Sequence, residues 1–241
     1  MNILLTGTKG FLGRHLIDYL DWTSLHNLYE YELPDNNFTN KHQLEDFIKL
    51  HDINIIIHVG AMAGLAQCMD LPTKAVHTNV FGTSVLLEMA LKYNCKFLHT
   101  STWAVNGCLE HPYDITKKAA EDLVMMYHKL YGLDTMILRM ATMYGPRMRP
   151  NGVIYAFLNN KLRKKSNIIQ GDGEQFRQFL YVDDAVKAFK RALQHWKSGA
   201  IYEVQGDEKV QIIDIARIVD PTLKQTVFTE ARLGDEHSFM V

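Results

Sequence analysis

Short apolar runs alternate with longer stretches of helical periodicity along the first 140 residues of the chain. Strand-like runs at 3–5, 28–32, 55–59, 97–101 and 135–139 are separated by amphipathic stretches at 11–20, 44–50, 80–93 and 113–131. The run at 55–59 is apolar apart from one histidine, which is typical of a parallel strand covered on both faces. Strands that alternate with helices imply βαβ crossovers. We therefore predict an α/β fold with a doubly wound parallel sheet.

The pattern changes after Gly145-Pro146, where residues 147–152 are rich in turn formers and the segments that follow are shorter. Asp183-Asp184 marks the start of a helix to about residue 195, because acidic side chains favour helix N-termini. A strand at 201–204 and a helix at 212–219 follow. We predict a sheet domain of residues 1–150 with a return segment at 178–205. Residues 151–177 and 206–241 form a small lobe, which we expect to be abbreviated at its C-terminal end.

Composition excludes several classes of protein. Apolar residues make up 47% and charged residues 22% of the chain, which is ordinary globular usage and excludes general disorder. With 26 Lys+Arg against 27 Asp+Glu, nothing favours a nucleic-acid or membrane partner. The three cysteines lack Cys-x-x-Cys spacing and the 11 histidines lack ligand spacing, so we expect no metal site. No signal-peptide pattern opens the chain, so we expect a cytoplasmic protein.

A glycine-rich loop, Thr6-Gly7-Thr8-Lys9-Gly10-Phe11-Leu12-Gly13, joins the first strand to the first helix. Gly7 suits a tight turn, Gly10 lets the backbone approach a pyrophosphate, and Gly13 lets the helix pack closely on the strand. The helix N-terminus offers free N–H groups to phosphates. Because an acidic residue also ends the second strand, the loop predicts a dinucleotide site.

A Tyr-x-x-x-Lys motif, Tyr113 to Lys117, begins the long helix and follows the strand end Thr100-Ser101-Thr102. Positions i and i+4 share a helix face about 6 Å apart along the axis. An ammonium group beside a phenol lowers the phenol pKa, so that the tyrosine can act as a base near neutral pH. Pro112 directly before the tyrosine suits the first turn of a helix.

In this order the motifs resemble those of the extended short-chain dehydrogenase/reductase family, the NAD-dependent nucleotide-sugar epimerases and dehydratases. The Gly-x-x-Gly-x-x-Gly spacing is similar to the loop of that family, and the resemblance covers nearly the whole chain. It implies a Rossmann-like fold. Further matching segments are Ile57–Ala61, Asn79–Thr83, Leu138-Arg139 to Pro146, Gly171 to Asp184 and Arg232 to Asp235.

The resemblance implies a role for individual residues. Thr102, Tyr113 and Lys117 match the catalytic positions. Trp103, Arg177, Arg232 and Asp235, together with Thr102, are expected to bind substrate. The cofactor-binding positions are Gly7, Gly10, Phe11, Leu12, Gly13, Glu32, Asn37, Phe38, Val59, Gly60, Ala61, Asn79, Tyr113 and Lys117.

Glu32 sits where the family places the acid that holds the adenosine ribose. A carboxylate there repels a 2′-phosphate, so NAD is favoured over NADP. Glu30 faces the same side of the strand, so the assignment between the two stays open. His58 is more often a satisfied core histidine than a ligand. By the same resemblance, the helices near 80–93 and 113–131 form the interface of a homodimer.

The residues after Thr102 bear on the reaction. Related dehydratases carry Asp-Glu there, whereas this chain has Trp103-Ala104, neither of which transfers protons. The resemblance therefore favours NAD-dependent epimerisation of a nucleotide sugar through a transient keto intermediate. An NAD(P)-dependent keto-sugar reductase or a nucleotide-sugar dehydratase are alternatives. A non-catalytic NAD-binding sensor or scaffold is the alternative of another class.

Overall fold

The computed structural model describes residues 1–19, 27–107, 109–150 and 152–230. The chain divides into two compact units, and each is described by itself. Unit 1 contains residues 1–140 and 183–204, and unit 2 contains residues 141–182 with the residues after 204. Residues 141–150 and 178–182 therefore belong to unit 2 and not to the sheet domain in which the sequence analysis placed them. The reason is that the strands Thr142–Tyr144 and Phe176–Tyr181 pair with each other, outside the main sheet.

Unit 1 is built on a six-stranded sheet in which every strand pair is parallel, and this confirms the predicted fold. Its strand order is β2-β1-β3-β4-β5-β9. The strands are β1 (Asn2–Thr6), β2 (Asn27–Tyr31), β3 (Ile55–His58), β4 (Lys96–Thr102), β5 (Thr135–Met140) and β9 (Ala200–Val204). The helical segments are α1 (Phe11–Tyr19), α2 (Lys41–Leu50), α3 (Leu65–Asp70), α4 (Pro72–Ala75), η1 (Val76–Phe81), α5 (Gly82–Lys92), η2 (Trp103–Asn106), α6 (Pro112–Tyr131) and α8 (Val182–Gln194).

The order of connections places a topological switch between β1 and β3. The chain leaves β1 for β2 on one side and then returns to β3 on the other side of β1. In open α/β sheets, ligands bind beyond the carboxyl ends of the strands at such a point. The glycine-rich loop follows β1 and the segment Val59–Ala61 follows β3, so both lie at this edge of the sheet.

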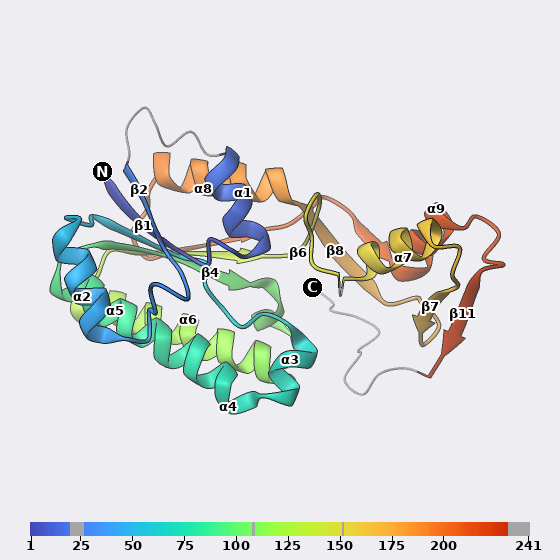
Figure 1. Ribbon diagram of the computed structural model, residues 1–241, viewed down its shortest axis with the longest axis horizontal. Coiled ribbons are helices and arrows are strands. Elements are labelled where there is room, and N and C mark those ends of the chain that lie inside the picture. Colours follow the sequence, from blue (N-terminus) through green and yellow to red (C-terminus); the bar gives the residue numbers. More distant parts are fainter. Residues whose placement is uncertain (20–26, 108, 151, 231–241) are drawn as a thin grey trace. The chain divides into compact units, whose positions relative to one another are not determined.

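Helices cover both faces of the sheet of unit 1. In Figure 1, α1 and α8 lie over one face, and α2, α5 and α6 lie over the other. The side chains that fill the layer next to α2, α5 and α6 are completely or almost completely buried, and Tyr31 is the largest of them. Burying apolar surface stabilises the fold by roughly 25 cal/mol per Å², so this layer contributes to the stability of unit 1. Its members include Leu4, Leu44, Ile48, Ile56, Leu86, Phe97, Val124 and Ile137.

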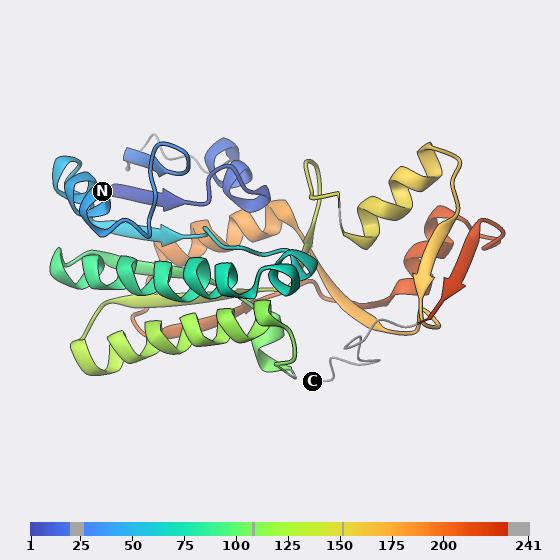
Figure 2. The ribbon, with the colours of Figure 1, turned by 60° about the horizontal axis from the view of Figure 1, so that its bottom comes forward.

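The helix predicted at 80–93 is the second half of a longer helical run. The run begins with Pro72 at the first helical position and continues from α4 through the π-helical segment η1 into α5. A π-helical turn widens a helix locally and is often found at functional sites. In η1 it accompanies the buried Asn79. Figure 2 shows α5 and α6 side by side along unit 1.

Unit 2 has its own small core. Its elements are β6 (Thr142–Tyr144), α7 (Val153–Leu162), β7 (Asn167–Gln170), β8 (Phe176–Tyr181), β10 (Lys209–Gln211), α9 (Ile212–Val219) and β11 (Thr226–Thr229). Strands β10, β8 and β6 form one sheet, and β7 pairs with β11 in parallel. Apolar side chains from α7, β7 and α9, Phe157 and Ile215 among them, form the core. Across the described ranges of both units, no helix has the length and apolar character that a membrane span requires.

Candidate active site

The glycine positions of the glycine-rich loop are too tightly packed for a side chain. Gly7 has a φ of +76°, and a Cβ atom there would lie 2.6 Å from the backbone nitrogen of Gly60. A Cβ atom on Gly13 would overlap the carbonyl oxygen of Gly7. The loop is closed by a hydrogen bond in which the backbone N–H of Gly10 donates to the Gly7 carbonyl, at 3.0 Å. Since α1 starts at Phe11, its leading N–H groups have no intrahelical acceptor and face the end of the loop.

The polar groups of this loop fit a dinucleotide. The Thr8 hydroxyl is buried and has no hydrogen-bond partner among the described residues. The sequence analysis did not single out Thr8, although a hydroxyl between two loop glycines was a usable signal. Glu32 follows the carboxyl end of β2, and its Oε2 lies 3.5 Å from the backbone nitrogen of Lys9. Glu30 is exposed and lies within β2, so Glu32 is the better candidate for the ribose acid.

The segment after β3 is held by Asn79 of η1. The Asn79 side chain accepts from the Met62 backbone N–H at 2.8 Å and donates to the Met62 carbonyl at 3.1 Å. It also donates to the Thr116 hydroxyl of α6 at 3.0 Å. Both amide N–H groups are therefore in use within the protein. Asn79 fixes Val59–Ala61 relative to α6, and direct contact with the cofactor stays a prediction.

Phe38 and Asn37 have clear roles in packing and in the turn. The Phe38 ring lies against Gly60 and Gly82 and makes an edge contact with His58 at a centroid distance of 5.3 Å. Asn37 accepts hydrogen bonds from the Thr39 backbone at 3.0 Å and from the Thr39 hydroxyl at 2.8 Å. Contact of Asn37 and Phe38 with the cofactor stays a prediction.

His58 is the middle of a buried chain of hydrogen bonds. The Gly60 N–H donates to Thr6 Oγ1 at 3.0 Å, and the same oxygen lies 2.8 Å from His58 Nδ1. The Thr83 hydroxyl donates to the Asn79 carbonyl at 2.6 Å, so it accepts from His58 Nε2–H at 3.1 Å. His58 is thus protonated on Nε2, and because its lowered pKa keeps the ring neutral, Nδ1 accepts the proton of the Thr6 hydroxyl. Burial, and second the charge of Lys117, lowers its pKa to about 3.

The catalytic candidates lie at the carboxyl end of β4. Thr102 ends the strand, and its Oγ1 accepts from the Ala104 N–H at 3.3 Å, which caps η2. Tyr113 lies in the first turn of α6 and packs on the cluster of Met62, Cys68 and Ala75. One turn further along α6, Lys117 extends to β4, where its Nζ donates to the Thr100 carbonyl at 2.6 Å. The three residue types are therefore brought to one edge of the sheet.

Lys117 is almost completely buried, with 4% of its surface exposed. Removal from water disfavours the charged form, and this lowers its pKa from 10.5 to about 8, while the negative charge of Glu121 acts in the opposite direction. A buried ammonium group costs stability, so its retention indicates a use.

A buried ion pair below the site was missed by the sequence analysis. Arg139 of β5 contacts both carboxylate oxygens of Glu121 on α6, at 2.5 and 3.2 Å. It also donates to Asn106 of η2 at 2.8 Å and to Glu203 of β9 at 3.3 Å. The network ties η2, which follows Thr102, to α6. The Glu at i+4 from Lys117 was the available signal.

The structure describes only some of the predicted substrate-binding residues. Trp103 is half-buried in η2, directly after Thr102. Arg177 belongs to unit 2, on β8, and its guanidinium donates to the Phe176 carbonyl at 2.8 Å. Arg232 and Asp235 lie outside the described residues. Within the described ranges, no three His, Cys, Asp or Glu side chains gather as a metal site would require.

Comparison with known proteins supplies the identification. Residues 3–204 match the NAD dependent epimerase/dehydratase family. The chain belongs to this family. A candidate UDP-glucose 4-epimerase of Methanocaldococcus jannaschii is 32% identical over 97% of the chain and 87% of that protein. A dTDP-D-glucose 4,6-dehydratase of Dictyostelium discoideum is 29% identical over 89% of the chain, and the match spans 60% of that protein.

Solved structures of epimerases have the same fold. The UDP-glucose 4-epimerase of Thermotoga maritima, solved with UDP-glucose, superposes with a TM-score of 0.88 at 28% identity, over 98% of the chain and 87% of that structure. The UDP-glucuronic acid 4-epimerase of Bacillus cereus, solved with UDP-glucuronic acid and NAD, gives 0.88 at 27% identity over 98% and 88%. As a member of the NAD dependent epimerase/dehydratase family, the chain is an enzyme with NAD as its cofactor.

The position of Glu32 leads to a prediction on cofactor choice. The charged 2′-phosphate of NADP would meet the Glu32 carboxylate, so wild type should bind NAD much more tightly than NADP in calorimetry. In Glu32→Gln the carboxylate charge is absent, and NADP binding should strengthen by roughly tenfold to a hundredfold. Glu30→Gln is the matched control and should change neither affinity. The reverse outcome, with Glu30→Gln altering the preference, would assign the ribose acid to Glu30.

Proposed function

We propose that the chain catalyses NAD-dependent epimerisation of a nucleotide sugar through a transient keto intermediate. The observation that carries this proposal is the placement of Lys117. Its buried ammonium group bonds to the Thr100 carbonyl at 2.6 Å, two residues before Thr102 and one helical turn from Tyr113. A base, a cation that lowers its pKa and a hydroxyl donor are the groups that oxidation of a sugar alcohol needs.

Each residue has a distinct part in the reaction. The Tyr113 phenolate removes the proton of the sugar hydroxyl. It returns the proton after the keto sugar has rotated in the site and presents its other face to the hydride. Thr102 hydrogen-bonds the same hydroxyl, and Lys117 stabilises the phenolate. Bound NAD supplies a reversible hydride acceptor. The glycine-rich loop with Thr8 would hold its pyrophosphate, Glu32 its adenosine ribose, and Lys117 its nicotinamide ribose.

Two observations argue against the alternatives. A dehydratase needs additional proton-transferring groups, and Trp103 and Ala104 follow Thr102 in η2. A scaffold that only binds NAD has no use for a lysine whose pKa is lowered to about 8 by burial, because the buried charge costs stability. A keto-sugar reductase would use the same Thr102, Tyr113 and Lys117, and only turnover separates it from an epimerase.

The test is incubation of the full chain and NAD with UDP-, dTDP-, GDP-, CDP- and ADP-sugars, followed by NMR of the products. The expected result is an equilibrium mixture of two epimers for one nucleotide sugar, with no net consumption of NAD. A deoxy-keto sugar would identify a dehydratase, and net oxidation of added NADH would identify a reductase. NAD binding without any turnover would support the scaffold.

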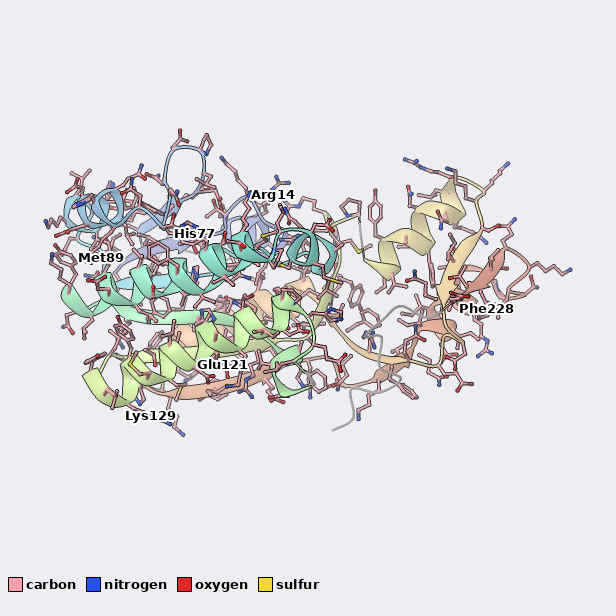
Figure 3. The ribbon with its side chains drawn as sticks, turned by 90° about the horizontal axis from the view of Figure 1, so that it is seen from below. Arg14, His77, Met89, Glu121, Lys129 and Phe228 are labelled. Atoms are coloured by element: carbon pink, nitrogen blue, oxygen red, sulfur yellow. The ribbon has the colours of Figure 1, made fainter. Side chains whose placement is uncertain are left out.

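We also propose that the enzyme is a homodimer joined through α5 and α6. Figure 3 looks onto these two helices, with Met89 on α5 and Glu121 and Lys129 on α6 labelled. Large apolar side chains remain exposed on them and on the adjoining η1, with Phe81 47%, Ile115 48% and Leu130 71% exposed. Apolar side chains on neighbouring helices suit an interface between two copies of the chain.

Light scattering at micromolar concentration should give the mass of a dimer. Phe81→Arg places a charge in the proposed interface and should shift the mass to that of a monomer. Ile218→Arg is the control, because Ile218 is 79% exposed on α9 of unit 2. A monomeric wild type, or a Phe81→Arg variant that stays dimeric, would contradict the proposed interface.

A further inference from the structure

His99 is a buried histidine that lies next to Lys117. The proposed reaction gives His99 no role. It lies in the middle of β4, opposite His58 of β3 and Ile137 of β5, and none of its surface is exposed. The centroid of its ring lies 5.6 Å from that of the His58 ring, and the Phe97 ring stacks near it. Its Nε2 atom lies 3.3 Å from Lys117 Nζ. A polar ring in this apolar layer requires an explanation.

The chemistry of the two groups sets the direction of this hydrogen bond. An ammonium group has only donors, so His99 Nε2 must be the unprotonated acceptor. The ring proton then resides on Nδ1, which is buried and has no partner among the described residues. Burial and, second, the charge of Lys117 hold the pKa of His99 well below its usual range, so the ring stays neutral.

This arrangement has a cost that an apolar ring would avoid. A buried N–H without a partner is unfavourable, and a phenylalanine of similar shape would not have one. The bond from Lys117 is the compensating interaction. Together with the Thr100 carbonyl, His99 accepts two of the three N–H groups of Lys117, which leaves one N–H to bind a ligand.

We propose that His99 is a positioning residue for Lys117, whose unprotonated Nε2 holds the ammonium group at the carboxyl end of β4 and favours its charged form. The inference rests on the proposed function of Lys117 in the epimerase. His99 acts through Lys117 and touches neither the substrate nor the reacting atoms.

Few other charged side chains on the elements around Lys117 are buried, and Asp114 of α6 is one of them. Glu121 lies one turn along α6 and favours the charged lysine, and Arg139 of β5 pairs with that carboxylate. His58 of β3 is neutral in its own hydrogen-bond chain. The phenol of Tyr113 is one turn back on α6. The titratable side chains of the helices packed on α6 are exposed apart from the buried Cys68 thiol: Asp70, Lys74, His77, Glu88 and Lys92.

The experiment measures the titration of Lys117 by NMR, on the full chain labelled with ¹³C at lysine Cε, before and after addition of NAD. The Lys117 signal is assigned by its loss in Lys117→Met. Wild type should titrate with a pKa near 8. His99→Phe keeps an aromatic ring of similar shape but removes the acceptor nitrogen. The pKa of Lys117 should therefore fall by about one pH unit or more. In His99→Gln the amide oxygen can take the place of Nε2 as the acceptor. This variant should recover most of the lost pKa of Lys117.

Two readouts keep this inference separate from the proposed reaction. The ¹⁵N signals of the His99 ring in wild type should show Nδ1 protonated and Nε2 unprotonated, and this needs neither substrate nor a variant. Where turnover is measured, the alkaline limb of the pH profile should move to lower pH in His99→Phe and return in His99→Gln. An unchanged lysine pKa in His99→Phe, or a ring protonated on Nε2, would overturn the inference even if the epimerase activity is found.

Discussion

Replacement of Tyr113 by phenylalanine is expected to lower turnover by roughly 10²–10⁴-fold, the usual contribution of a positioned acid–base group. The substitution removes one oxygen atom and keeps the ring, so its packing on Met62, Cys68 and Ala75 is retained. NAD affinity should therefore change little, because the glycine-rich loop and Lys117 remain. The measurement is turnover of the nucleotide sugar that wild type epimerises, together with calorimetry of NAD binding.

The control for this change lies on the same helix. Tyr131 ends α6 and is 55% exposed, so Tyr131→Phe should keep full activity. Thr102→Val should cost less than Tyr113→Phe, because it removes a hydrogen bond and not the proton acceptor. Full activity in Tyr113→Phe would refute the role of the tyrosine as base.

The buried histidines are expected to destabilise the protein as the pH falls from 6.5 toward 3. The folded chain keeps His58 neutral, since burial lowers its pKa to about 3, whereas the unfolded chain binds a proton at an ordinary histidine pKa near 6.5. Within this window the unfolded state carries more protons, so the free energy of unfolding decreases with falling pH. A difference of 3.5 pH units at 1.36 kcal/mol each amounts to about 5 kcal/mol for His58 alone. His99 acts in the same direction.

Urea unfolding at a series of pH values measures this effect. His58→Asn cannot ionise, so its free energy of unfolding should be lower at pH 7 but should depend less on pH between 6.5 and 3. His195→Asn is the control at an exposed position, and its pH dependence should equal that of wild type. A His58→Asn profile parallel to the wild-type profile would show that His58 is not the group responsible.

The sheet of unit 1 could be predicted from the sequence because its strands are short and apolar and alternate with amphipathic helices. The run at 55–59 and the helix at 113–131 are examples, and the structure reproduces both within about a residue or two. Spacing alone also brought Tyr113 and Lys117 to one helix face. The roles of the loop glycines could be predicted because close approach of the backbone excludes every larger residue at these positions.

The remainder depends on contacts between distant segments. The strands of unit 2 are three to six residues long, and β6 pairs with β8 across more than 30 residues, so no local pattern predicts them. The hydrogen bonds of Asn79 to Met62 and Thr116, and that of Lys117 to His99, join residues from different elements. Local periodicity predicts burial of His99 but not which atom its ring meets.

The most direct test of the proposed epimerisation follows the hydrogen atom on the carbon whose configuration inverts. A substrate found in the nucleotide-sugar panel is prepared with deuterium at that carbon and converted in ordinary water, and the product is analysed by NMR and mass spectrometry. Reversible oxidation within one active site predicts that the product keeps the deuterium on the same carbon. Loss of deuterium to the solvent, or its transfer to another carbon of the sugar, would contradict the mechanism.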